Sequence, residues 1–161
     1  MADDIAEAGD IASIAGALVL NIGTLNARTV ESMVEAGKRA NQAGVPVVLD
    51  PVGAGASALR NETTERLLKD VKLTVLRGNL SEISFIAGEQ SNTKGVDAGA
   101  ADAGNDAVAI AKKVAKQLGC VVGITGQVDV VSDGTRVAKI ENGVKMLGKV
   151  TGTGCMTSAL V

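Results

Sequence analysis

Residues 44–57 read GVPVVLDPVGAGAS, and this stretch decides the class of fold. Its first half, 46–50, is a short apolar run with proline in the first position, where a strand tolerates a missing N–H group. Apolar residues recur at helical spacing before this run, in 26–43, and after it, in 58–71. A buried strand between two amphipathic helices is typical of βαβ units, so the stretch predicts an α/β fold with a parallel sheet.

The same alternation continues along the chain in both directions. Further strands are expected at 17–22, 72–76 and 120–125, and further helices at about 80–87 and 105–118. The polar segment 88–104 has no periodicity and is expected to be a surface loop. After these elements, two extended segments meet at Asp133-Gly134, a tight-turn dipeptide that predicts a late antiparallel hairpin. We expect a single domain over residues 1–161, with a mostly parallel central sheet in three α/β/α layers.

Composition excludes several kinds of function. The chain has no histidine, which rules out a histidine base or a histidine-ligated metal within it, and its two cysteines cannot form a disulfide framework. A net charge of −2 and an aromatic content of 1% argue against a nucleic-acid surface. No apolar run is long enough to span a bilayer, and the acidic start is unlike a secretory signal. We expect a cytoplasmic protein with no nucleic-acid or membrane partner.

The sequence TGTGC at 151–155 leads into a final helix and is the strongest local signal. Small residues at Gly152, Thr153 and Gly154 let the backbone approach an anion, and the start of a helix presents unpaired N–H groups to it. Phosphoryl transfer requires such an anion hole. The alternative is an ordinary glycine-rich turn at a helix start. The final helix stops at Val161, within its second turn, so we expect that the chain is cut at its C-terminus.

A second signal follows the third predicted strand, where Arg77 and Asn79 are followed by Glu82. Open α/β sheets bind ligands at the carboxyl ends of their strands, and an arginine there is suited to a phosphate. Asn79 and Glu82 would provide a magnesium site, directly or through water. The alternative is that these two residues cap the next helix.

Two more polar groups end strands at the same edge. Asp50 ends the strand of the opening stretch and is a candidate for magnesium-bound water or substrate, although a turn-forming aspartate is common there. Thr125 ends the fourth strand and suits a phosphate. The convergence of these groups on one edge of the sheet favours the functional interpretation of each.

The two cysteines are expected to differ. Cys155 lies on the first turn of a helix, where the dipole favours a thiolate, and is a candidate general base toward an alcohol. Cys120 lies within an apolar strand and is expected to be an inert buried thiol.

Six segments, in this order and spacing, resemble the hydroxyethylthiazole kinase family of the ribokinase-like superfamily: 20–25 (LNIGTL), 44–57, 77–83 (RGNLSEI), 94–99 (KGVDAG), 124–134 (ITGQVDVVSDG) and 149–155 (KVTGTGC). The resemblance implies ATP- and Mg²⁺-dependent phosphorylation of the hydroxyethyl group of 4-methyl-5-(2-hydroxyethyl)thiazole, in thiamine biosynthesis and salvage. It also implies a homotrimer. Members of the family are longer at both ends, so a chain truncated at both ends is expected.

The resemblance implies roles for individual positions. Those positions are Arg77 and Thr125 at the ATP phosphates, Gly152 and Met1 at the substrate, Asp50 and Glu82 at the metal, and Cys155 at the catalytic position. Because most relatives in the superfamily have aspartate at that last position, the anion hole and the metal would supply much of the acceleration, with Cys155 assisting.

Two other readings remain open at this point. In the first, the chain is another ribokinase-like enzyme, such as a pyrimidine kinase or an ATP/ADP-dependent hydrate dehydratase. In the second, it is a non-catalytic fragment that binds phosphate or nucleotide.

Overall fold

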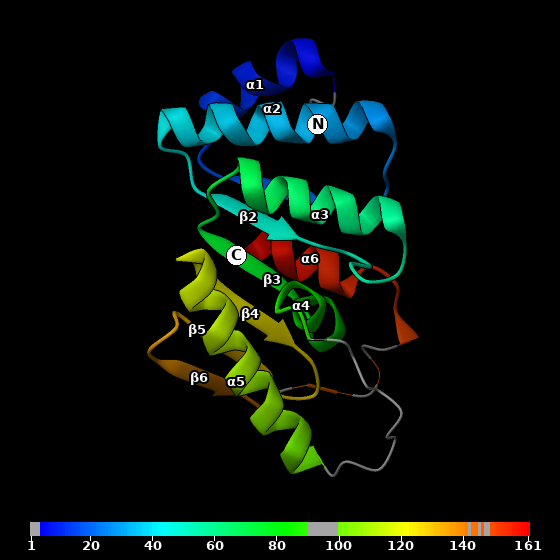
Figure 1. Ribbon diagram of the computed structural model, residues 1–161, viewed down its shortest axis with the longest axis vertical. Coiled ribbons are helices and arrows are strands. Elements are labelled where there is room, and N and C mark those ends of the chain that lie inside the picture. The colour runs from blue at the N-terminus through cyan, green and yellow to red at the C-terminus, as the bar shows by residue number, and fades with distance from the viewer. Residues whose placement is uncertain (1–3, 90–99, 142, 145, 147–148) are drawn as a thin grey trace.

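The computed structural model describes residues 4–89, 100–141, 143–144, 146 and 149–161, and for residues 100–105 it describes the backbone only. A six-stranded sheet runs through it, and its strands lie side by side in the order in which they occur in the chain. They are β1 (Leu18–Asn21), β2 (Val47–Asp50), β3 (Val75–Asn79), β4 (Val121–Thr125), β5 (Asp129–Ser132) and β6 (Val137–Ile140). β1 to β4 are mutually parallel, and β5 and β6 are antiparallel to their neighbours (Figure 1).

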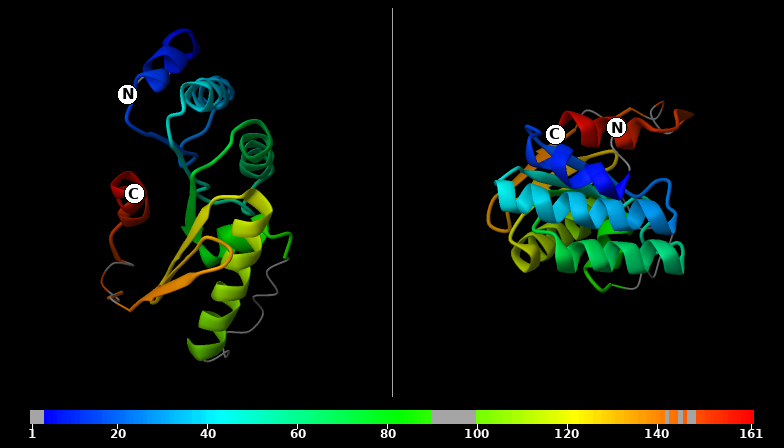
Figure 2. Two further views of the ribbon diagram at one scale, coloured as in Figure 1. Left: turned by 90° about the vertical axis from the view of Figure 1, so that its left-hand side faces the viewer. Right: turned by 90° about the horizontal axis from the view of Figure 1, so that it is seen from above.

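Six helices accompany the sheet among the described residues. They are α1 (Ile5–Ser13), α2 (Ala27–Ala43), α3 (Ala58–Asp70), α4 (Leu80–Ile86), α5 (Ala100–Leu118) and α6 (Thr153–Leu160). Because each parallel crossover is right-handed and the strand order always advances in one direction, α2, α3 and α5 lie on one face of the sheet. α6 lies on the opposite face, and α1 packs on α2 at the edge (Figure 2). The predicted three layers are therefore present, with α6 as the described part of the third.

The two faces of the sheet carry different residues. Leu76, Val122, Ile124 and Val130 point toward α2, α3 and α5 and are buried in the core. The opposite face carries polar side chains near the carboxyl ends of the strands: Asn21 is paired with Asp50 on the neighbouring strand, and the Asp50 carboxylate lies 3.8 Å from the Arg77 guanidinium. β2 is buried along its whole length, because helices cover both of its faces.

Most predicted elements are confirmed, but three boundaries are wrong. β3 begins at Val75 rather than at 72, because the Asn41 side chain hydrogen-bonds both the N–H group and the carbonyl of Lys72 and keeps it out of the sheet. The strand then extends through Asn79, so Arg77 lies within it. α5 begins at Ala100, inside the segment predicted to be a loop.

α1 was not predicted at all. Its start is capped by Asp4, whose carboxylate accepts a hydrogen bond from the Ala6 amide, and Ala8 and Ala12 pack against α2. The hairpin at Asp133-Gly134 is confirmed by the pairing of β5 with β6. Within the described residues, none of the helices combines the length and the apolar character needed to cross a membrane.

Candidate functional site

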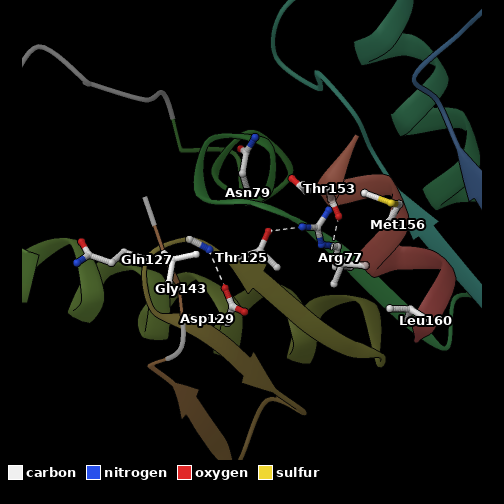
Figure 3. Close-up of a pocket in the computed structure, with 13 residues that line it drawn as sticks. Arg77, Asn79, Thr125, Gln127, Asp129, Gly143, Thr153, Met156 and Leu160 are labelled. Carbon is white, nitrogen blue, oxygen red and sulfur yellow. Dashed lines mark hydrogen bonds between the residues drawn. The ribbon is translucent and has the colours of Figure 1, made fainter. Parts of the chain in front are cut away.

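A pocket of about 800 Å³ opens between the carboxyl ends of β3 and β4 and the start of α6. Figure 3 shows its side chains converging from these elements. Its lining includes five residues singled out from the sequence at strand ends and at the helix start: Arg77, Asn79, Thr125, Thr153 and Gly154. The parallel strands bring these groups to one edge of the sheet, which confirms the convergence that the sequence predicted.

Arg77 is the basic side chain among the described residues that line this pocket, which also include the acidic Asp129. Its Nη2 donates a hydrogen bond of 2.6 Å to the Thr125 Oγ1, and its Nη1 lies 3.8 Å from the Asp50 Oδ2. The Arg77 side chain is only 11% exposed, and its Nε has no hydrogen-bond partner among the described residues. A buried guanidinium nitrogen without a partner is uncommon, because leaving such a donor unpaired is costly.

Asp50 is held by groups from three other elements. Its Oδ2 accepts hydrogen bonds from the Asn21 Nδ2 at 3.0 Å and from the Ser158 Oγ at 2.8 Å, and it faces Arg77. The Asp50 side chain is 2% exposed, so these partners compensate a carboxylate that water does not reach. Asp50 was expected to serve the metal, but in the structure its carboxylate already accepts hydrogen bonds from the protein and faces Arg77.

The start of α6 provides backbone N–H groups. Gly152 is its N-cap, with the left-handed φ of 89° that favours glycine, and no side chain caps this end. The amide of Met156 bonds to the Gly152 carbonyl, so the amides before it point out of the helix start. Gly154 lies directly against Arg77, since a Cβ built there would be 2.8 Å from the Arg77 Nη1. The arrangement joins helix-start amides and a guanidinium, which together suit a phosphate.

The two cysteines differ as predicted. Cys155 is exposed on the first turn of α6, while Cys120 is buried beside β4. Burial raises the pKa of the Cys120 thiol to about 11, against a smaller opposing effect of a hydrogen bond with the Leu76 backbone. The large pocket is lined by Thr153, Gly154 and Met156, which are near Cys155 in the sequence. Cys155 itself is not among the described residues that line this pocket.

Asn79 and Glu82 form a capping box at the start of α4. The Asn79 Oδ1 accepts from the Glu82 amide at 2.9 Å, and the Glu82 Oε2 accepts from the Asn79 amide at 2.8 Å. The other oxygen, Oε1, accepts from the Gly53 amide at 2.8 Å. Glu82 thus fastens the 51–55 loop to α4, and the capping interpretation is confirmed.

No set of three or more cysteine, aspartate or glutamate side chains suited to a metal ion occurs in the described part of the chain. Asn79 lines both the large pocket and a second hollow of about 250 Å³ beside the 53–56 backbone, and Glu82 lines the second hollow only. The carboxylates expected at the metal, Asp50 and Glu82, therefore belong to no cluster of three or more such side chains among the described residues.

Three residues that hold the site together from outside the pocket lining were not singled out by the sequence analysis. Asn21 and Ser158 hold Asp50, and Arg60 donates to the carbonyls of residues 22, 23 and 52, which ties the loops after β1 and β2 together. Asn21 ends its strand as Asp50 does, so the tendency of α/β sheets to bind ligands at the carboxyl ends of strands could have identified it. No local pattern singles out Arg60 or Ser158. Met1, expected at the substrate, lies outside the described residues.

Comparison with known proteins gives a consistent result. The model of the "Hydroxyethylthiazole kinase family" matches residues 1–161. The chain is 65% identical over 162 residues to the hydroxyethylthiazole kinase of Ruminiclostridium cellulolyticum and 63% identical over 164 residues to that of Clostridium beijerinckii. In both cases the match covers 100% of this chain and 59% of the relative, so the chain spans about 59% of the length of these curated relatives.

Solved structures show the same likeness. The hydroxyethylthiazole kinase protein from Pyrococcus horikoshii OT3 superposes with a TM-score of 0.88 at 40% identity, over 99% of this chain and 58% of that one. The ADP complex of Bacillus subtilis pyridoxal kinase superposes with a TM-score of 0.57 at 26% identity, over 79% of this chain and 48% of that one.

Proposed function

Because the chain belongs to the hydroxyethylthiazole kinase family, with a ribokinase-like α/β fold, we propose that this protein phosphorylates the hydroxyethyl group of 4-methyl-5-(2-hydroxyethyl)thiazole with ATP. The step would serve thiamine biosynthesis and salvage. The γ-phosphoryl group passes from the β–γ bridging oxygen of ATP to the alcohol oxygen, the alcohol loses its proton, and ADP leaves.

The observation that carries the proposal is the pairing of Arg77 with the start of α6. The Arg77 Nη1 lies 2.8 Å from the position that a Cβ on Gly154 would occupy, and the Arg77 Nε has no partner in the described structure. Charge in phosphoryl transfer spreads over the equatorial oxygens of the transferred group, so fixed donors aimed at that group lower the barrier. Arg77 and Thr125 are proposed to bind the ATP phosphates, and the backbone of residues 152–155 to bind the group in transfer.

The alcohol is proposed to lie near Gly152 and Cys155. Gly152 is the N-cap of α6 and Cys155 lies on its first turn, where its exposed sulfur is accessible to an alcohol. A substrate contact from Met1 remains a prediction of the sequence, as do the homotrimer and a cytoplasmic location.

Magnesium is proposed to bind through its water molecules rather than through a cluster of carboxylates. Both Glu82 oxygens and the Asn79 Oδ1 already accept backbone hydrogen bonds, but a carboxylate has about four acceptor sites, so capacity remains for hydrogen bonds from metal-bound water. Mg²⁺ commonly keeps several waters and is held by substrate phosphates together with one or two carboxylates. The ion would neutralise charge on the phosphates.

The test is an ATP-consumption assay with the thiazole alcohol and Mg²⁺. The chain is measured beside the full-length Ruminiclostridium cellulolyticum relative as a positive control. Turnover by both would support the proposal for this chain. Nucleotide binding without turnover by this chain would favour the non-catalytic alternative, and a folded chain that neither binds nor turns over ATP would contradict the proposal.

The identity of the alcohol requires its own comparison, because a pyridoxal kinase shares the fold. The same assay is run with pyridoxal and with a hydroxymethylpyrimidine in place of the thiazole alcohol. A preference for the thiazole alcohol would support the proposed substrate, and a preference for either of the others would overturn it.

A further inference from the structure

α6 is attached to the sheet in an unusual way. It has eight residues, and among them only Ser158 is buried, whereas Met156 and Leu160 are 57% and 89% exposed. Helices of this length usually depend on an apolar face for their position. Here the buried contact with the sheet includes a hydrogen bond, from the Ser158 Oγ to the Asp50 Oδ2 at 2.8 Å.

The direction of this hydrogen bond follows from the acceptors around the hydroxyl. The Ser158 Oγ lies 2.8 Å from the Asp50 Oδ2 and 3.3 Å from the Gly154 carbonyl of its own helix. A hydroxyl has one hydrogen to donate, and a carboxylate is the stronger acceptor. Ser158 therefore donates to Asp50, and α6 is tied to the end of β2.

The same carboxylate oxygen also faces the phosphate-binding arginine. The Asp50 Oδ2 lies 3.8 Å from the Arg77 Nη1, and that nitrogen lies close to Gly154, 2.8 Å from where a Cβ would stand, one helical turn before Ser158. Asp50 thus links the helix start to the guanidinium (Figure 3 shows Arg77 beside the α6 residues). A displacement of α6 would separate the amides at 152–155 from Arg77.

We propose that Ser158 is a positioning residue, whose hydroxyl, acting through Asp50, holds the first turn of α6 against Arg77 so that both bind the same phosphate. The proposal rests on the proposed function, since it assigns Ser158 to the phosphate site described above. Loss of the hydroxyl removes one of the donors to the Asp50 Oδ2, which leaves α6 less firmly attached to the sheet.

The test compares three variants by two measurements. Ser158→Ala removes the hydroxyl, and Ser158→Thr keeps it. Ser32→Ala is the matched control, because Ser32 is also buried in a helix and its hydroxyl bonds to the carbonyl four residues earlier, but it lies on α2. Hydrogen exchange of the α6 amides reports the attachment of the helix, and calorimetric titration with ATP and with inorganic tripolyphosphate reports the phosphate site.

We expect Ser158→Ala to raise the exchange rate of the α6 amides and the dissociation constants of ATP and tripolyphosphate by roughly tenfold, as for loss of a hydrogen bond to a charged group. Ser158→Thr and Ser32→Ala should resemble the parent chain in both measurements. The proposal is overturned if α6 exchange is unchanged in Ser158→Ala, or if Ser158→Thr behaves as Ser158→Ala does. A parent chain that binds neither ligand would count against the proposed function, while the exchange measurement would still decide whether Ser158 positions α6.

Discussion

The Arg77 guanidinium donates a hydrogen bond of 2.6 Å to the hydroxyl of Thr125, on the neighbouring parallel strand. This bond fixes the plane of the guanidinium at the carboxyl edge of the sheet (Figure 3). A guanidinium with a fixed plane can present two donors to a phosphate, which a flexible lysine does not do.

Replacement of Thr125 by valine is expected to weaken ATP binding. Valine keeps the shape of threonine but lacks the acceptor, so Arg77 loses its orientation, and the loss of a hydrogen bond to a charged group costs about 1.5–3 kcal/mol, or roughly tenfold to a hundredfold in the dissociation constant. Thr125→Ser, which keeps the hydroxyl, is the control. Equal ATP affinity in the parent chain and Thr125→Val, measured by calorimetry, would contradict the role of this bond.

Replacement of Arg77 by alanine is expected to weaken ATP more strongly, and to lower stability as well, because Asp50 would be left buried without its counter-charge. Thermal unfolding of the same variant separates the two effects. Unchanged ATP affinity in a folded Arg77→Ala chain would show that the phosphates bind elsewhere.

Gly154→Ala is expected to reduce ATP binding by roughly tenfold without lowering stability. The new Cβ would lie 2.8 Å from the Arg77 Nη1, so the guanidinium would have to move, while alanine in place of glycine within a helix favours the helix by about 1 kcal/mol. Gly16→Ala is a suitable control, since a Cβ at that position meets nothing within 4 Å. An ATP affinity like that of the parent chain would show that the contact has no role.

Cys155→Ala is expected to lower turnover by roughly a hundredfold or more, the usual contribution of a general base, and to change ATP affinity little. The measurement is steady-state kinetics beside calorimetry, on this chain if it turns over and otherwise at the aligned position of the full-length relative. Turnover equal to that of the parent would remove the thiol from the mechanism.

The two thiols are expected to react at different rates. Cys155 is exposed, whereas Cys120 is buried with its pKa raised to about 11, so at about pH 8 a disulfide reagent should modify one thiol quickly and the second only after unfolding. Cys120→Ala should leave the fast phase intact, and Cys155→Ala should abolish it. If both thiols of the native chain reacted quickly with the disulfide reagent, the buried position of Cys120 would be contradicted.

The β5–β6 hairpin is expected to depend on pH through Asp133. Hydrogen bonds from the amides of Arg136 and Thr135, and then from the Arg136 side chain, lower the pKa of Asp133 from 3.8 to about 2. Because the folded pKa lies below the ordinary value, the stabilisation is complete above the ordinary value and is lost as the pH falls toward 2. Carbon NMR should give a titration midpoint near pH 2 for the Asp133 carboxyl. The difference in unfolding free energy between the parent chain and Asp133→Asn should shrink as the pH falls from the ordinary pKa toward 2.

Apart from α1, the sequence by itself determined the kinds of element and their order, because hydrophobic spacing and turn dipeptides act over a few residues. The strand in 46–50, the helix in 58–71 and the hairpin at Asp133-Gly134 are examples. It also indicated which polar residues end at one edge of the sheet, since parallel strands place their carboxyl ends together.

Only the tertiary structure decided how those polar residues are connected. The contact of Ser158 with Asp50 joins residues 108 positions apart, and the late start of β3 depends on Asn41 of a helix 31 residues earlier. Contacts of this kind follow from the packing of α6 on one face of the sheet and of α2 on the other, which no local pattern encodes. The physical reason is that periodicity specifies which face of an element is apolar, whereas the partner of a buried polar group is set by how separate elements pack together.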